Sequence, residues 1–181
     1  MQIGFINKLA LLSLLPFLVT IAHADTTTNS RWGFEVQVYP TGVIPGIRYE
    51  WDLSTQDQLF ARVAYNFTDR SDFGENDDES GGGPGIGLGW RHWLNSAGNE
   101  WHYGARLDIW DLDIDWEEDG PPESDGKTDV IVMQPSGELG YSWKQTDGSR
   151  LDLTAGLGVE VNVDTDGEDV GEGIIVLGGI S

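Results

Sequence analysis

The chain has 181 residues, and 31 acidic side chains against 10 basic ones give a formal net charge of −21 at pH 7. A surface of that sign repels the phosphate backbone of nucleic acid, so we expect no nucleic-acid partner. The sequence contains no cysteine, which excludes a disulfide framework and a thiolate metal site. The length suffices for one domain.

The N-terminal segment, residues 1–24, predicts a cleaved signal peptide. Lys8 supplies a positive charge, residues 9–21 form an apolar stretch too short to span a bilayer as a helix, and Ala22-His23-Ala24 gives the small-x-small cleavage pattern. We therefore expect a single mature domain, residues 25–181. An uncleaved anchor helix is the alternative, and the shortness of the apolar stretch argues against it.

After this segment, apolar and polar residues alternate with a period of two. Successive side chains on a strand point to opposite faces, so the pattern predicts β-strands. The fifth of these strands changes its apolar parity, and a β-bulge is therefore expected near Ile109–Asp111. The predicted strands cover residues 31–39, 43–53, 59–67, 85–94, 101–116, 131–144, 151–163 and 173–181.

The connections between the predicted strands differ in length. Three of them are long and acidic, residues 68–83, 117–128 and 164–172, and the others are short turns. Links of a few residues exclude parallel crossovers. We therefore predict an all-β fold, an eight-stranded antiparallel up-and-down β-barrel. Its long loops lie at one end, and its short turns, apart from the first, lie at the other.

Two kinds of barrel fit this pattern. A soluble barrel buries its apolar face, whereas an outer-membrane barrel turns that face to lipid and carries aromatic residues at both interfaces. Aromatic residues lie near the strand ends on the predicted apolar face, so we expect a transmembrane β-barrel. A soluble periplasmic barrel that binds a small apolar ligand is the alternative. The predicted aromatic belt comprises Trp32, Trp51, Trp101 and Trp143 at the short-turn end and Tyr39, Tyr65 and Phe67 towards the loop end.

The opposite face of the strands carries charges of both signs. Inside an eight-stranded barrel these charges must pair, because a lone buried charge is costly and the interior is only wide enough for side chains. We predict an interior plugged by paired charges, with ordinary water-exposed surface charges as the alternative. The predicted network comprises Glu35, Arg48, Glu50, Arg62, Arg91, Arg106, Asp108, Glu138, Asp152 and Glu160.

These features resemble the small eight-stranded outer-membrane barrels of the OmpA-like, OmpX-like and OmpW-like class. The resemblance covers the whole mature chain and rests on pattern, not on a motif. It implies an outer-membrane location, contact with membrane lipid and lipopolysaccharide, insertion by the barrel-assembly machinery, and a structural or surface-interaction role. One departure is the segment Gly178–Ser181, where the class usually has a terminal aromatic residue.

Catalysis is not expected from the sequence. Outer-membrane lipid-modifying enzymes of similar size use a histidine with serine partners at the outer side, but His92 and His102 lie near the short-turn end. The acidic loops suggest a weak calcium site, or bridging Ca²⁺ or Mg²⁺, although simple solvation explains them better. The candidate ligands are Asp164, Asp166, Glu168 and Asp169.

Overall fold

The computed structural model describes residues 30–70, 75–95, 100–118, 121, 124–146 and 149–181, so the predicted signal peptide lies outside the described residues. No helix in these ranges is long and apolar enough to cross a membrane. The described elements are β1 (Ser30–Tyr39), β2 (Gly42–Asp52), β3 (Asp57–Asp69), β4 (Asp78–Trp93), β5 (Glu100–Glu118), β6 (Ser124–Lys144), β7 (Arg150–Asp166) and β8 (Gly173–Ile180).

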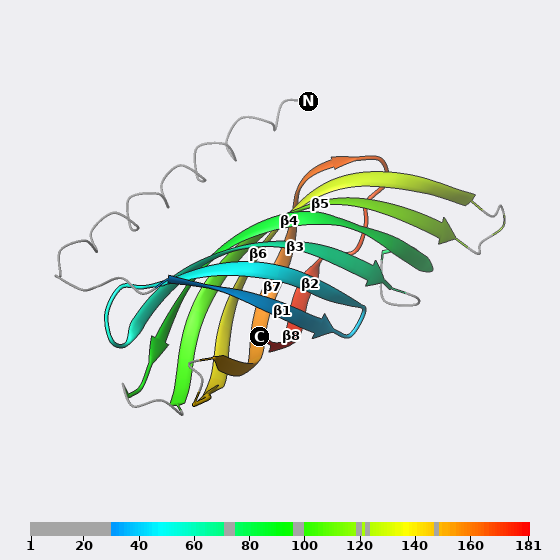
Figure 1. Ribbon diagram of the computed structural model, residues 1–181. Helices are drawn as coiled ribbons and strands as arrows, with labels where there is room; N and C mark the ends of the chain where they lie inside the picture. The colour runs from blue at the N-terminus through cyan, green and yellow to red at the C-terminus, as the bar shows by residue number, and fades with distance from the viewer. Residues whose placement is uncertain (1–29, 71–74, 96–99, 119–120, 122–123, 147–148) are drawn as a thin grey trace.

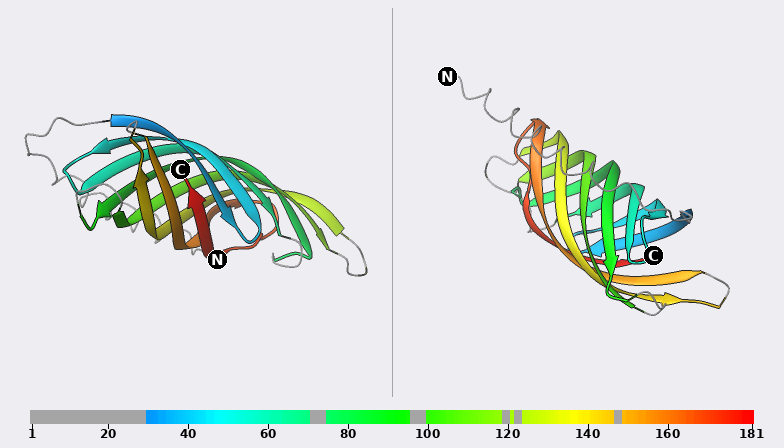
Figure 2. Two further views of the ribbon diagram at one scale, coloured as in Figure 1. Left: turned by 60° about the horizontal axis from the view of Figure 1, so that its bottom comes forward. Right: turned by 90° about the vertical axis from the view of Figure 1, so that its left-hand side faces the viewer.

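The strands form one closed barrel in chain order, and each is antiparallel to its neighbours (Figure 1). The predicted eight-stranded antiparallel up-and-down β-barrel is therefore confirmed. Two further views show the strands winding obliquely around the ring (Figure 2). The ring closes where β1 pairs with β8, through Val36–Ile180, Gln37–Gly179 and Val38–Gly178.

The strands differ greatly in length, and the β5–β6 hairpin projects beyond the rest of the barrel (Figure 1). β5 has 19 residues and β6 has 21, against 10 in β1 and 8 in β8. The long loops predicted at 68–83 and 117–128 are therefore partly wrong, because strand structure occupies much of both ranges.

Over most of the barrel the apolar side chains point outward and the polar ones inward. On β7, Leu153 and Leu157 are 54% and 60% exposed, whereas Asp152 and Glu160 are 1% and 7% exposed. The period-two pattern of the sequence thus separates an outer apolar surface from an inner polar one.

This relation inverts at the loop end of β5. Ile109 is exposed, but Asp111 and Asp113 occupy the next outward positions and Trp110 and Leu112 are buried inside. The predicted β-bulge near Ile109–Asp111 is wrong, because β5 and β6 stay paired in one register throughout. Along β5 the same set of side chains keeps pointing outward, and only the polarity of that outer face changes. A register irregularity occurs instead in the β6–β7 pair, between Ile131 and Val132.

The inward apolar residues at this end form a compact cluster, here called the loop-end core. It includes Val170 from the connection between β7 and β8, so this connection folds over the barrel mouth. The members of the loop-end core are Tyr39, Ile44, Ala64, Trp110, Leu112, Ile114, Val130, Val132, Val170, Ile175 and Leu177.

Glycines on β4 let interior side chains approach the backbone closely. A Cβ atom on Gly89 would lie 2.2 Å from Cζ of Phe60. The Phe60 ring cannot retreat easily, because the guanidinium groups of Arg48 and Arg91 lie 5.6 and 5.5 Å from its centroid. The exposed Gly137 differs, since the nearest atom to its added Cβ is a backbone oxygen at 3.9 Å.

We expect Gly89→Ala to lower the free energy of unfolding by about 1–3 kcal/mol, because the added methyl group overpacks the interior. Urea titrations of the barrel refolded into lipid vesicles would measure this loss. Gly137→Ala is the matched control and should unfold close to the wild-type midpoint. Equal losses in the two variants would contradict a steric role for Gly89.

Candidate functional site

The middle of the barrel interior is filled by ion pairs between strands. Arg62 on β3 places Nε 2.8 Å from Oδ1 of Asp108 and Nη1 2.5 Å from Oε1 of Glu35. Arg106 on β5 places Nε 2.7 Å from Oδ2 of the same aspartate. These side chains are buried, and together they join β1, β3 and β5 across the interior.

A second centre of the network is Asp152 on β7. Its carboxylate lies 2.7 Å from Nη2 of Arg48, 2.8 Å from Nη1 of Arg91 and 2.8 Å from Nε of Arg150. Asp152 is 1% exposed, so three guanidinium groups share one carboxylate away from water. Such a carboxylate is costly to remove, because its cationic partners stay buried.

Two glutamates extend these centres into one network. Glu138 lies 3.0 Å from Nη2 of Arg91 and 3.8 Å from Nη1 of Arg106, and Glu50 lies 2.6 Å from Nε of Arg48. All the predicted interior charges except Glu160 therefore belong to one connected set.

Glu160 sits apart, nearer the loop end. Its carboxylate lies 3.0 Å from Nη2 of Arg70, which also pairs with Glu79 and donates to the backbone oxygen of Gly171. This smaller group ties the end of β3 to β4, β7 and the connection after β7.

Sequence reasoning missed Arg150, Arg70, Glu79 and Arg31. The parity of Arg150 could have revealed it, because it stands two residues before Asp152 and shares its inward face. Arg70 and Glu79 fell within a segment that was predicted to be a loop. Arg31 pairs at the short-turn end with Glu50 and Asp52, at 3.0 and 2.9 Å.

Aromatic rings support the buried guanidinium groups. Arg62 lies over the ring of Trp110 at 5.2 Å, and Arg150 lies over the ring of Trp93 at 5.0 Å. A cation over an aromatic face is attracted by the ring quadrupole. The rings therefore fill the space between ion pairs without leaving the cations unsupported.

The outer surface carries most of the predicted aromatic belt. Trp32 is the most exposed of these rings, at 74%, and packs against Tyr49 with ring centroids 4.9 Å apart. At the other end Tyr65 and Phe67 are exposed and lie 4.5 Å apart. Of the remaining predicted members, Trp101 and Trp143 are exposed and Trp51 is half-buried.

Tyr39 does not belong to this belt, so its assignment was wrong. It is 8% exposed, and its hydroxyl group donates to Oδ1 of Asn66 at 2.6 Å inside the barrel. The outward side chains of β1 have even numbers, such as Trp32 and Val38, and Tyr39 has the opposite parity.

The acidic residues of the last connection are not gathered around one point. Within the described ranges, no three Asp, Glu, His or Cys side chains are placed to hold a metal ion. Asp164, Asp166, Glu168 and Asp169 therefore form no preassembled site, although all four are described.

The two histidines of the described chain have structural partners. Nδ1 of His92 lies 2.9 Å from Oδ1 of Asp57 near the short-turn end. Nδ1 of His102 lies 3.2 Å from Oγ of Ser142, and both of these residues are 0% exposed. A serine and histidine shielded in this way cannot reach a lipid substrate.

No family model matches the chain, and no curated protein matches it. Among solved structures it is similar to the N-terminal β-barrel domain of Pseudomonas aeruginosa OprF, with 10% identity over 83% of this chain and 93% of that chain and a TM-score of 0.48. Neisserial surface protein A is 13% identical over 83% and 92% of the two chains, with a TM-score of 0.49.

A third similar structure is Ail, the attachment invasion locus protein of Yersinia pestis, in complex with the heparin analogue sucrose octasulfate. It is 8% identical over 85% of this chain and 97% of that chain, with a TM-score of 0.39. All three are small eight-stranded outer-membrane β-barrels, the class predicted from the sequence. Because the identities and scores are low, the fold assignment rests on the strand pairing described above.

Proposed function

We propose that this protein is an integral outer-membrane β-barrel with a plugged, non-conducting interior and an acidic surface outside the membrane. The proposal rests on the inverted distribution of side chains. Ile86 is 62% exposed and Leu157 60% exposed, while Arg62 and Asp108 are buried in the interior. In water this arrangement would be unfavourable, whereas lipid accommodates an apolar exterior.

On β5 the outer apolar band is long enough to cross a bilayer and has a sharp upper limit. On β5 the outward residues are apolar from Trp101 to Ile109 and acidic from Asp111 to Asp115. A tilted strand needs roughly 9–11 residues to cross a bilayer, which matches this span. The acidic part would face lipopolysaccharide phosphates, and bridging Ca²⁺ or Mg²⁺ would relieve their repulsion.

Two features close the interior. The ion-pair network fills the middle of the barrel, and the loop-end core packs the mouth with apolar side chains. A barrel of eight strands has no spare width for a water channel once such side chains occupy it. A structural or surface-interaction role therefore fits better than transport through the barrel.

The other candidate functions have less support. A soluble barrel that binds an apolar ligand needs its apolar face inside, the reverse of the arrangement on β7. A lipid-modifying enzyme needs an accessible nucleophile and base, and the Ser142–His102 pair is enclosed.

Single-cysteine labelling tests the proposal, because the chain has no cysteine of its own. Asp125 and Lys144 are exposed residues near opposite ends of β6. A membrane-impermeant maleimide should label Asp125→Cys on intact cells and should label Lys144→Cys only after lysis. The protein should also need detergent for extraction. Release of the folded protein with the periplasmic contents would refute the membrane assignment.

Planar-bilayer recordings test the plugged interior separately. The purified barrel should insert without producing unitary currents. Steady single-channel conductance from the wild-type protein would show that the ion-pair network leaves a path for ions.

A further inference from the structure

An apolar groove of about 260 Å³ lies on the outer face of the barrel, across β3 to β6. Its floor is a row of paired residues, because Ile86 on β4 is paired with Val63 on β3 and with Ile109 on β5. These three side chains point outward and are between 45% and 64% exposed. Ile131 on β6 and Pro84 on β4 also line the groove. The groove is therefore a hollow in the outer apolar band.

Asp111 lines the same groove on the side of the loop end. It is the first acidic residue on the outward face of β5, where the apolar band ends. Within the described chain, its carboxylate forms no ion pair or hydrogen bond with another residue. Asp111 is paired with Ile131, which is paired in turn with the exposed Asp164. The groove thus ends at a negative charge that no neighbouring cation compensates.

A backbone acceptor lies at the same end of the groove. β4 and β5 keep one register on both sides of this point, which puts Pro84 opposite Asp111. Leu94 and Trp101 belong to the same alternate series of pairs and are joined by a backbone hydrogen bond of 3.0 Å. Proline has no N–H group, so β4 cannot donate to the backbone oxygen of Asp111 as this series requires. An acceptor left unpaired in this way is unfavourable unless water or a ligand bonds to it.

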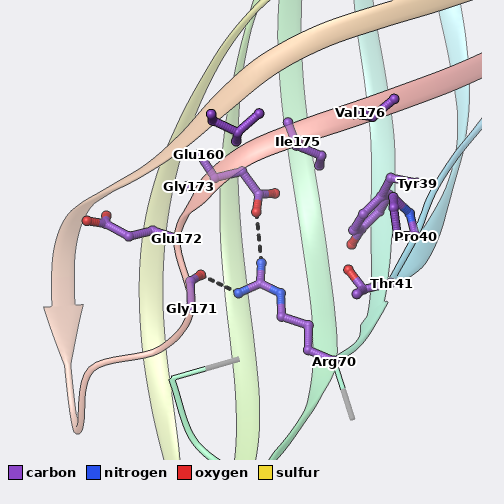
Figure 3. A pocket seen from close by; sticks show the side chains of 11 residues that line it. Tyr39, Pro40, Thr41, Arg70, Glu160, Gly171, Glu172, Gly173, Ile175 and Val176 are labelled. Atoms are coloured by element: carbon purple, nitrogen blue, oxygen red, sulfur yellow. Dashed lines mark hydrogen bonds and ion pairs between the residues drawn. The ribbon is translucent and has the colours of Figure 1, made fainter. Parts of the chain in front are cut away.

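A second hollow, beside β8, has no such free groups. There Arg70 crosses the space and reaches the carboxylate of Glu160 and the backbone oxygen of Gly171 (Figure 3). Glu172 in the same hollow accepts a hydrogen bond from the N–H group of Asn162. These charges are already used within the protein, so the groove that ends at Asp111 is the better candidate for a ligand site.

The position of the groove indicates that its occupant is a lipid. In the proposed membrane orientation, on which this inference rests, Ile86 and Ile109 face hydrocarbon and Asp111 lies at the boundary with water. A hydrocarbon chain can reach the groove from the bilayer and cover its apolar floor. A cationic headgroup would stay beside Asp111, above the hydrocarbon, so no charge has to enter the bilayer. A phosphate headgroup would instead be repelled by the carboxylate.

We propose that this groove binds a membrane lipid that has a primary ammonium group in its headgroup. One hydrocarbon chain lies over Ile86 and Ile109, and the ammonium group pairs with the carboxylate of Asp111 and donates to its backbone oxygen. An ammonium group has three donors and no acceptor, which suits a site that offers only acceptors. The volume of the groove is below the roughly 300–1,000 Å³ of pockets for drug-sized ligands, so it suits a segment of one chain.

Photolabelling of the full-length barrel in phosphatidylcholine nanodiscs tests this proposal at neutral pH. The probe is hexadecylamine with a diazirine group in its chain, and the corresponding alcohol and phosphate monoester are the matched controls. Mass spectrometry locates the labelled residues. The amine should label Ile86 and Ile109 about tenfold more than the alcohol does. All three probes should label Leu157 alike, because this outward residue is paired with Gly137 and Val176, away from the acidic boundary.

Three variants separate the carboxylate from the groove. Asp111→Asn should lower labelling by the amine about fivefold, towards the level of the alcohol. Glu117→Gln removes an exposed carboxylate further along the same face of β5 and should leave labelling within about twofold of wild type. Ile86→Trp should fill the groove and reduce labelling of Ile109 about tenfold. Circular dichroism checks folding, and the comparison of headgroups on the wild-type protein decides should a variant misfold.

Three results would overturn the proposal. They are equal labelling of the groove by the amine and the alcohol, unchanged labelling of folded Asp111→Asn, and labelling by the phosphate monoester that matches the amine once millimolar Ca²⁺ is present. The last result would show that a bridging calcium ion occupies the acidic end of the groove. Failure of the membrane assignment would look different, because the barrel would not enter the nanodiscs and no probe would label Leu157.

Discussion

Leu157→Arg is expected to lower the free energy of unfolding in lipid vesicles by about 2–4 kcal/mol. Leu157 lies on the outer face of β7, halfway along an apolar run that extends from Leu151 to Val163. In the proposed orientation a guanidinium group at this place would sit near the bilayer midplane. Few polar groups lie within reach there, so the loss in stability comes from removing the guanidinium group from water.

The matched control places the same charge outward on another strand of the barrel. Asp113 is exposed on β5 beyond the acidic boundary at Asp111. Asp113→Arg should change the free energy of unfolding by no more than about 0.5 kcal/mol, as is usual for exposed sites. Denaturant titrations in vesicles measure both variants. If Leu157→Arg inserts and unfolds like wild type, the outer face of β7 does not contact lipid.

Asp152→Leu should be the most damaging interior substitution, with an expected loss of about 3–5 kcal/mol. Asp152 faces Arg48, Arg91 and Arg150, and the substitution leaves these buried cations without their shared carboxylate. The same denaturant titrations would measure the loss, and a reduced yield of folded barrel should accompany it.

An exposed ion pair provides the control for this prediction. Nζ of Lys127 lies 2.6 Å from Oδ1 of Asp115 on the projecting hairpin, and their side chains are 69% and 56% exposed. The hydrogen bond to Asp115 raises the pKa of the Lys127 ammonium group. Water screens such a pair, so Lys127→Ala should leave the unfolding midpoint unchanged. Comparable losses in Lys127→Ala and Asp152→Leu would show that burial does not determine the strength of these pairs.

The barrel topology could be predicted from the sequence because strand alternation is a local signal. Leu151 to Val163 alternates without interruption, and its apolar and polar faces are the outer and inner faces of the barrel as the parity requires. Short turns then fix antiparallel neighbours. The inward parity of residues such as Arg48 and Asp152 follows from the same rule.

The partners inside the barrel could not be predicted in this way. Arg48 and Asp152 are 104 positions apart, and their contact depends on the stagger of every strand pair around the ring. The change at Asp111 was misread for a related reason. Periodicity shows which positions are apolar, but a change of parity can arise in two ways. The strand can shift its faces, or the same face can pass from an apolar environment to water.

That change at Asp111 also limits how an inserted barrel can move. Sliding inward would draw aspartates into hydrocarbon, and sliding outward would expose Ile109 and Leu107 to water. Both displacements cost free energy, so the boundary holds the protein at one depth. In the proposed orientation the acidic hairpin must also cross the bilayer during insertion, and reversing the orientation would require a second crossing. The direction of the barrel is thus set once, when the hairpin is carried across.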